Sequence, residues 1–74
     1  MQTLVDVPTG AIAIVQQFQG GREFAARAAA LGFTLGVEIT VIHNYGSGPI
    51  LVGVRGARVA LGRGEASKIR VTTL

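Results

Sequence analysis

Few side chains in this sequence are suited to catalysis or to metal binding. The chain has one histidine, no cysteine and four carboxylates. The histidine is His43, and the carboxylates are Asp6, Glu23, Glu38 and Glu65. These carboxylates fall in four separate predicted elements, without the spacing of metal ligands or of an acid and base pair. Because thiol chemistry is also excluded, we predict that the chain is not an enzyme and needs no cofactor.

His43 is the one imidazole that would be available to a metal ion. It lies at the end of a predicted strand and has the same phase as Val37, Ile39 and Val41. A histidine in this position is expected at the rim of the hydrophobic core. His43 is therefore the only candidate metal ligand, and no metal site is predicted.

Arg55 and Arg58 suggest the binding of a partner molecule instead. The Gly56-Ala57 pair between them fits a two-residue hairpin loop with glycine in first place, as in a type II′ turn. Like charges in direct opposition and a glycine inside a strand both weaken a sheet, and such local violations often mark functional surfaces. The cross-strand pairs predicted from this loop are Arg55 with Arg58, Gly53 with Ala60, and Leu51 with Gly62.

The outer face of this hairpin is the predicted partner-binding surface. We call it the hairpin stripe, and it consists of Leu51, Gly53, Arg55, Arg58 and Ala60. Tyr45, in a glycine-flanked loop, is added as an aromatic anchor. The alternative is that the arginines extend into solvent and keep the hairpin soluble, while the Tyr45 ring folds back over the barrel mouth.

Short strands separated by glycine turns must position these residues. Strands are predicted at Ala11 to Phe18, Val37 to Asn44, Pro49 to Arg55, Arg58 to Gly62 and Ile69 to Thr73. In the first strand, Val15 and Ile12 are expected to face inward. The last strand is expected to pair with the first, which gives a small closed or nearly closed barrel of about five strands.

One short helix is predicted between the first and second strands, from Arg22 to Leu31. Phe24, Ala28 and Leu31 recur at helical spacing, so we expect all three to face the core. Gly32 follows the last of them and is expected to end the helix. The predicted fold class is therefore mainly β, with one domain over residues 1–74.

The composition favours a protein that binds another protein. Of the 74 residues, 49% are hydrophobic and 15% are charged, whereas about 25% charged is usual. The apolar surplus predicts a protein partner or self-association, unless the many alanines account for it. No apolar run approaches the ~18 residues that a membrane span needs, and the first residues do not resemble a secretion signal. A cytoplasmic protein without membrane insertion is expected.

The order of these features resembles the ferrous iron transport protein A (FeoA) family. The residues that carry the resemblance are the Pro8-Thr9-Gly10 turn, Arg27 to Leu31 followed by Gly32-Phe33, Gly36, Gly48-Pro49-Ile50, Val59 to Arg63, Ala66 and Ile69. The resemblance implies an SH3-like β-barrel, which also occurs as the C-terminal domain of iron-dependent repressors. It further implies a cytoplasmic accessory or regulatory protein that acts with ferrous iron transport protein B, a membrane protein with a GTP-binding cytoplasmic part.

Two other functions stay open from the residues. The resemblance also implies transition-metal binding, or a metal-bridged oligomer. The residues that this sequence offers for it are His43 and scattered carboxylates. A net charge of +3 would suit nucleic acid, but a nucleic-acid barrel needs exposed aromatic residues among its basic ones, and only Tyr45 qualifies. Nucleic acid is therefore the least favoured partner.

Overall fold

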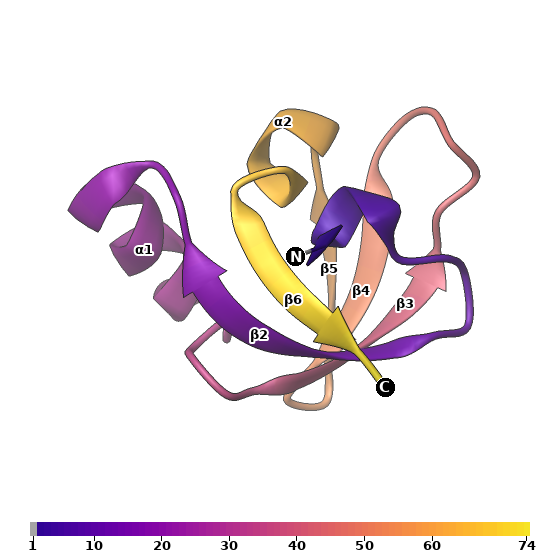
Figure 1. Cartoon of the computed structure of the whole chain (residues 1–74), viewed down its shortest axis with the longest axis horizontal. Coiled ribbons are helices and arrows are strands. Elements are labelled where there is room, and N and C mark those ends of the chain that lie inside the picture. The colour runs from indigo at the N-terminus through magenta and orange to yellow at the C-terminus, as the bar shows by residue number, and fades with distance from the viewer. Residues whose placement is uncertain (1) are drawn as a thin grey trace.

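The chain folds into a strongly curved antiparallel sheet, and its alternating apolar and polar residues give that sheet one buried face. A computed structural model describes residues 2–74 (Figure 1). The elements are β1 (Gln2–Thr3), the 3₁₀ helix η1 (Leu4–Asp6), β2 (Ile12–Phe18), α1 (Gly21–Ala30), β3 (Glu38–His43), β4 (Ile50–Val54), β5 (Ala57–Leu61), α2 (Arg63–Ala66) and β6 (Ile69–Thr73). The strand order is β1-β6-β2-β3-β4-β5. Within residues 2–74, neither helix has the length and apolar character needed to cross a membrane.

The mainly β prediction is confirmed, including the pairing of the last strand with the first long one. β6 lies antiparallel to β2, and Val15 is opposite Val71. The sheet has six strands rather than about five, because the chain start adds the two-residue β1 to the free side of β6. It is also an open sheet, with β1 and β5 as its two edges.

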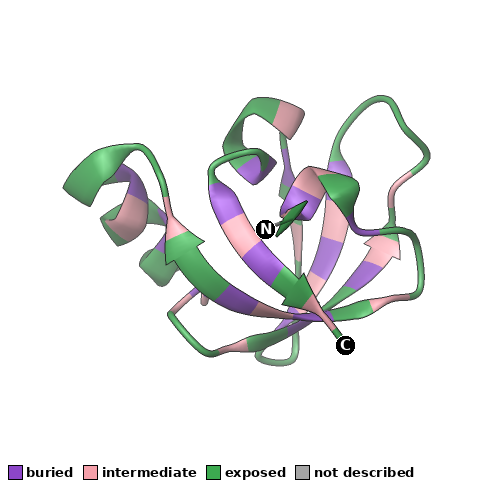
Figure 2. Cartoon of the chain, viewed as in Figure 1, coloured by how far each residue is buried: buried purple, intermediate pink, exposed green. Residues whose placement is uncertain are grey.

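The core lies inside the curve of the sheet. Buried residues alternate with half-buried ones along β4 and with half-buried or exposed ones along β6, as the banding in Figure 2 shows. This alternation is expected of a sheet with one wet face. The largest fully buried side chains are Phe33, Leu4, Ile39, Ile50, Ile69, Val7, Val15, Val41, Val52, Val54 and Val71.

Two β-bulges change which face the following residues present. In β2 the register shifts between Val15 and Gln17, so Phe18 returns to the core side and pairs with Ile69. Ala13 and Val15 are fully buried, whereas Ile12 is 38% exposed. The prediction that Ile12 faces inward is therefore wrong, because alternation before the bulge gives the inward positions to Ala13 and Val15.

Helix α1 ends one residue earlier than predicted, which removes Leu31 from the core. Phe24 and Ala28 are buried, as expected, but Leu31 is 45% exposed. The amides of Gly32 and Phe33 donate to the carbonyls of Ala29 and Ala28, both at 2.9 Å, in the pattern of a Schellman motif. Gly32 has φ +101° and turns the chain, so Phe33 fills the core position predicted for Leu31.

Candidate functional site

The β4–β5 hairpin has a different turn from the one predicted. Its two-residue loop is Arg55-Gly56, with φ +49° and +78°, and positive φ at both positions is the signature of a type I′ turn. Val54 is opposite Ala57, and Gly53 is opposite Arg58. The predicted opposition of Arg55 and Arg58 is therefore wrong. Glycine occupies the second loop position, and Arg55 itself adopts the left-handed conformation.

The assignment of residues to the two faces of the hairpin survives this correction. The true pairs differ from the predicted ones by two residues, and an even shift leaves each side chain on its own face. Val52, Val54 and Leu61 are buried, and Val59 is half-buried. On the other face lie the hairpin stripe residues Leu51, Gly53, Arg58 and Ala60, where Ala60 is opposite Leu51.

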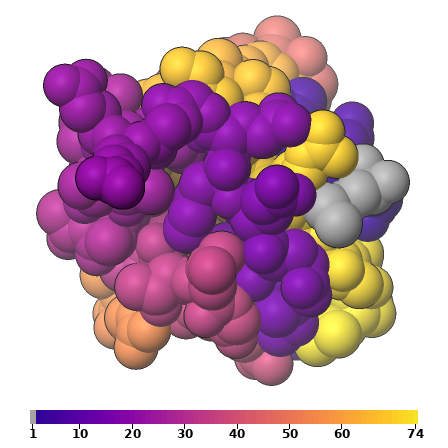
Figure 3. Space-filling view, turned by 60° about the vertical axis from the view of Figure 1, so that its left-hand side comes forward, coloured from indigo at the N-terminus to yellow at the C-terminus, as the bar shows by residue number. Residues whose placement is uncertain are grey.

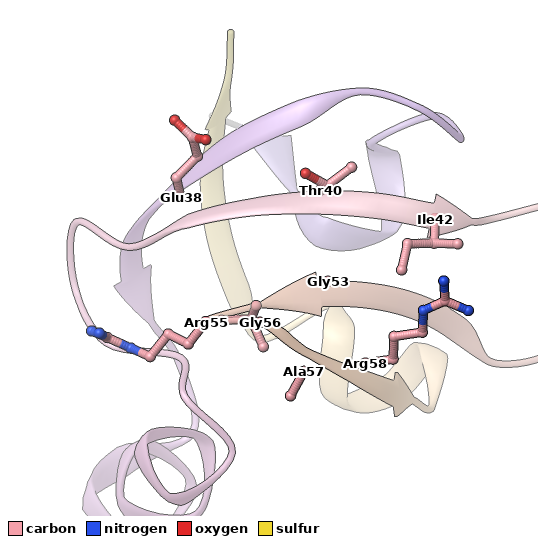
Figure 4. A pocket seen from close by; sticks show the side chains of 9 residues that line it. Glu38, Thr40, Ile42, Gly53, Arg55, Gly56, Ala57 and Arg58 are labelled. Carbon is pink, nitrogen blue, oxygen red and sulfur yellow. The ribbon is translucent and has the colours of Figure 1, made fainter.

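Arg55 is a structural residue more than a free cation. Its Nε donates to the carbonyl of Gly32 at 3.1 Å, and its Nη2 donates to Thr34 Oγ1 at 2.7 Å. Figure 4 shows the side chain pointing away from Arg58, toward the segment that follows α1. Arg55 therefore fastens the hairpin turn to the end of the helix, and Arg58 is the cation left on the stripe.

A shallow groove lies on the outer face of β3, β4 and β5. It has a volume of about 350 Å³, and its lining residues are Glu38, Thr40, Ile42, Gly53, Val54, Arg55, Gly56, Ala57 and Arg58. Gly53 forms part of the floor, where an added Cβ would lie 3.5 Å from Ile42 Cδ1. In Figure 4, Arg58 and Ile42 approach each other across Gly53. Gly53 and Arg58 thus belong to a concave surface with apolar, hydroxyl and charged groups.

The β3 side of this groove was not predicted from the sequence. Glu38, Thr40 and Ile42 alternate with the inward Ile39 and Val41, so their phase carried the signal. Recognising the groove also requires the pairing of β3 with β4, which sets Thr40 opposite Gly53. The groove becomes recognisable only when the outer faces of both hairpin strands and β3 are considered together.

His43 and Tyr45 form a separate exposed pair at the other end of β4. Their ring centroids are 3.8 Å apart, and Tyr45 is 71% exposed. The prediction that His43 lies at the core rim is wrong, because a register shift between Val41 and His43 places His43 opposite Leu51, on the outer face. Tyr45 and Arg55 therefore lie at opposite ends of the predicted partner-binding surface.

The described residues give His43 no ligand set. Among residues 2–74, no three side chains of the histidine, aspartate or glutamate type lie together as metal ligands would. The aromatic neighbour of His43 is the Tyr45 ring, which is tilted by 51° against the imidazole.

A second hollow lies where β2 approaches the start of α1. Its volume is about 390 Å³, and it is lined by Gln16, Gln17, Phe18, Gly21, Arg22, Ala25 and Leu35. Figure 3 shows the side of the molecule to which β2 and α1 contribute. Its lining includes Phe18, Ala25 and Leu35, so this hollow is the more apolar of the two.

Comparison with known proteins shows the family. The model of the FeoA domain matches residues 2–73. The chain belongs to the FeoA domain family. A relative from Methanocaldococcus jannaschii, which carries the name of an Fe(2+) transport protein A, is 32% identical over 71 residues, covering 96% of this chain and 85% of the relative.

Solved FeoA structures share the whole fold. A crystal structure of an iron uptake regulatory protein, FeoA, superposes with a TM-score of 0.92 at 32% identity, covering 99% of this chain and 97% of the other. The zinc complex of Stenotrophomonas maltophilia FeoA, described as an SH3 domain protein, has a TM-score of 0.80 at 31% identity, with coverage of 97% and 91%. The SH3-like description of the fold is therefore confirmed.

The FeoA fold also recurs in larger proteins. A manganese-dependent transcriptional repressor matches with a TM-score of 0.87 at 24% identity, and the match covers 99% of this chain but 41% of the repressor. At this identity the likeness concerns the fold alone.

Asn44 organises the loop beside the stripe in this FeoA-family chain and was not recognised from the sequence. Its Nδ2 donates to the carbonyls of Val5 at 3.0 Å and Val7 at 2.8 Å. Its Oδ1 accepts from Arg63 Nη2 at 3.1 Å and from the Gly46 amide at 3.3 Å. One side chain thus joins the chain start, the Tyr45 loop and α2. An asparagine before a glycine-rich loop was the available signal.

Proposed function

We propose that this chain is a cytoplasmic accessory or regulatory protein of ferrous iron transport. In this proposal it acts by binding the GTP-binding cytoplasmic part of ferrous iron transport protein B. The observation that carries the proposal is membership of the FeoA domain family over residues 2–73. The names of its relatives connect that family with iron uptake and Fe(2+) transport.

The groove on β3, β4 and β5 is the surface that we assign to the partner. Apart from Arg55, whose side chain is engaged with Gly32 and Thr34, the groove offers Arg58 as a cation and Ile42 as an apolar contact. Gly53 allows a partner to approach the sheet backbone closely. Leu51, Ala60 and the Tyr45 loop extend the same face. Such a mixture of a small apolar centre and a charged rim is usual for protein interfaces.

The surface is tested by charge reversal at Arg58. Arg58→Glu is expected to weaken binding of the cytoplasmic part of protein B about tenfold, since it replaces an attractive rim charge by a repulsive one. Isothermal titration calorimetry at two salt concentrations measures the change.

Arg22→Glu is the matched control, because Arg22 is also exposed and lies on α1, beside the second hollow. It makes the same change in net charge. Arg55→Glu is unsuitable for this purpose, since it would break the bonds to Gly32 and Thr34. Equal losses in Arg58→Glu and Arg22→Glu, or no loss in either, would eliminate the groove as the binding surface.

A further inference from the structure

β5 is an open edge of the sheet. It pairs with β4 along Ala57–Leu61 and stands last in the strand order. The other edge, β1, has only two residues. An edge strand presents one side of its backbone to solvent, and those unpaired groups can bind a further strand.

The hairpin register determines which backbone groups are unpaired. Val54 and Ala57 flank the Arg55-Gly56 turn and therefore form its closing hydrogen-bonded pair. Hydrogen-bonded and non-hydrogen-bonded pairs alternate along an antiparallel ladder. Arg58 and Ala60 hence occupy the non-hydrogen-bonded positions, and their N–H and C=O groups point away from β4.

From this geometry we infer that β5 accepts an extended acidic segment of the partner protein as an additional strand. This inference rests on the proposed function and adds how the partner is held. The backbone groups of Arg58 and Ala60 bond to the added strand, while a carboxylate beside them meets the Arg58 guanidinium. Main-chain bonds give affinity in such complexes, and the flanking side chains give specificity.

The edge has few of the features that block strand addition. Its register with β4 has no bulge, and it contains no proline. The residues from Ala57 to Ala60 are exposed or half-buried, and two of them are alanines. Arg58 is the only charged residue of the strand. A lone arginine beside small side chains repels a basic strand and attracts an acidic one.

Charge complementarity favours an acidic partner over a second copy of this chain. The net charge is +3, and β5 carries an arginine and no carboxylate. Pairing two copies through β5 would bring two Arg58 side chains to one joined edge without an acid between them. On the outer face, side chains of the added strand lie beside Arg58, which itself borders the groove.

The test is Ala60→Pro, with Ala60→Ser as the matched control. Proline removes the outward N–H of Ala60, and an edge strand tolerates it where that N–H faces solvent. We expect Ala60→Pro to weaken binding of the cytoplasmic part of protein B at least tenfold by calorimetry. Ala60→Ser retains the N–H and is expected to stay within about twofold of the wild type.

Amide hydrogen exchange of the wild-type complex supplies a readout that does not depend on the folding of the variant. The amides of Arg58 and Ala60 are expected to become protected when the partner binds. No added protection there, together with undiminished binding of Ala60→Pro, overturns strand addition and leaves the proposed function standing. A wild-type chain that does not bind protein B overturns both. Sedimentation can instead be used to look for a homodimer. If a homodimer forms and Ala60→Pro abolishes it, the added strand comes from a second copy of this chain and not from an acidic segment, which overturns the inference.

Discussion

At the scale of single residues, two polar side chains do most to position the candidate site. Asn44 links three segments through its amide group, and Arg55 links the hairpin turn to the end of α1. Neither role follows from residue type alone. Arg55 in particular was expected on the binding surface, but the left-handed turn directs it to Gly32 and Thr34. Arg58 is thereby left as the arginine of the groove.

Asn44→Ala is expected to destabilise the fold by about 2–3 kcal/mol, since it leaves the carbonyls of Val5 and Val7 without their donor in a partly buried position. Urea denaturation followed by circular dichroism measures the loss. The control is Ser47→Ala in the same loop, where Ser47 is exposed and a change within ~0.5 kcal/mol is expected. Equal stability of Asn44→Ala and Ser47→Ala would contradict the linking role.

Arg55→Ala and Arg55→Gly separate the two effects at this position. Both remove the bonds to Gly32 and Thr34, which are worth about 1 kcal/mol on an exposed surface. Glycine also relieves the cost of φ +49°, which is about 1 kcal/mol for a residue with a Cβ. We expect Arg55→Ala to be less stable than wild type and Arg55→Gly to be close to it. Thermal unfolding measures the stability of both variants. An alanine variant at least as stable as the glycine variant would refute the cost assigned to the left-handed conformation of Arg55.

At the scale of elements, local irregularities decide where side chains point. Alternation predicted the buried faces of β4 and the first part of β3 correctly. It failed for His43 because a bulge reverses the phase near the strand end, and a bulge leaves little trace in a single sequence. The predicted hairpin register was wrong because Gly56 fits two turn types with different loop positions, and the sequence alone does not distinguish between them.

The end of α1 gives a prediction at this scale. Gly32→Ala is expected to destabilise the fold by about 1–2 kcal/mol, because φ +101° is unfavourable for any residue with a Cβ. The added methyl would be in ordinary contact with Val54 Cγ2 and Arg55 Cδ, both at 3.5 Å, so the loss comes from the backbone conformation. Gly64→Ala in α2 has open space around it and is expected to be neutral or slightly stabilising. A thermal midpoint for Gly32→Ala at or above that of Gly64→Ala would disprove the capping role.

At the scale of the whole molecule, the sequence predicted the fold better than the surface. The glycine turns and strand phases were enough for a small, mainly β domain whose last strand pairs with the first long one. The groove was only half recognised, because it joins the outer faces of three strands and depends on a pairing that spans a loop. Sequence separation hides such a surface, since its residues come from positions 38 to 58.

The central claim is that the groove on β3, β4 and β5 binds the cytoplasmic part of ferrous iron transport protein B. Its most direct test is to titrate that part into isotope-labelled protein and to map the amide chemical shifts. We predict shifts concentrated at Thr40, Ile42, Gly53 and Arg58. Shifts confined to Phe18, Ala25 and Leu35 in the second hollow, with the groove unchanged, would contradict the claim.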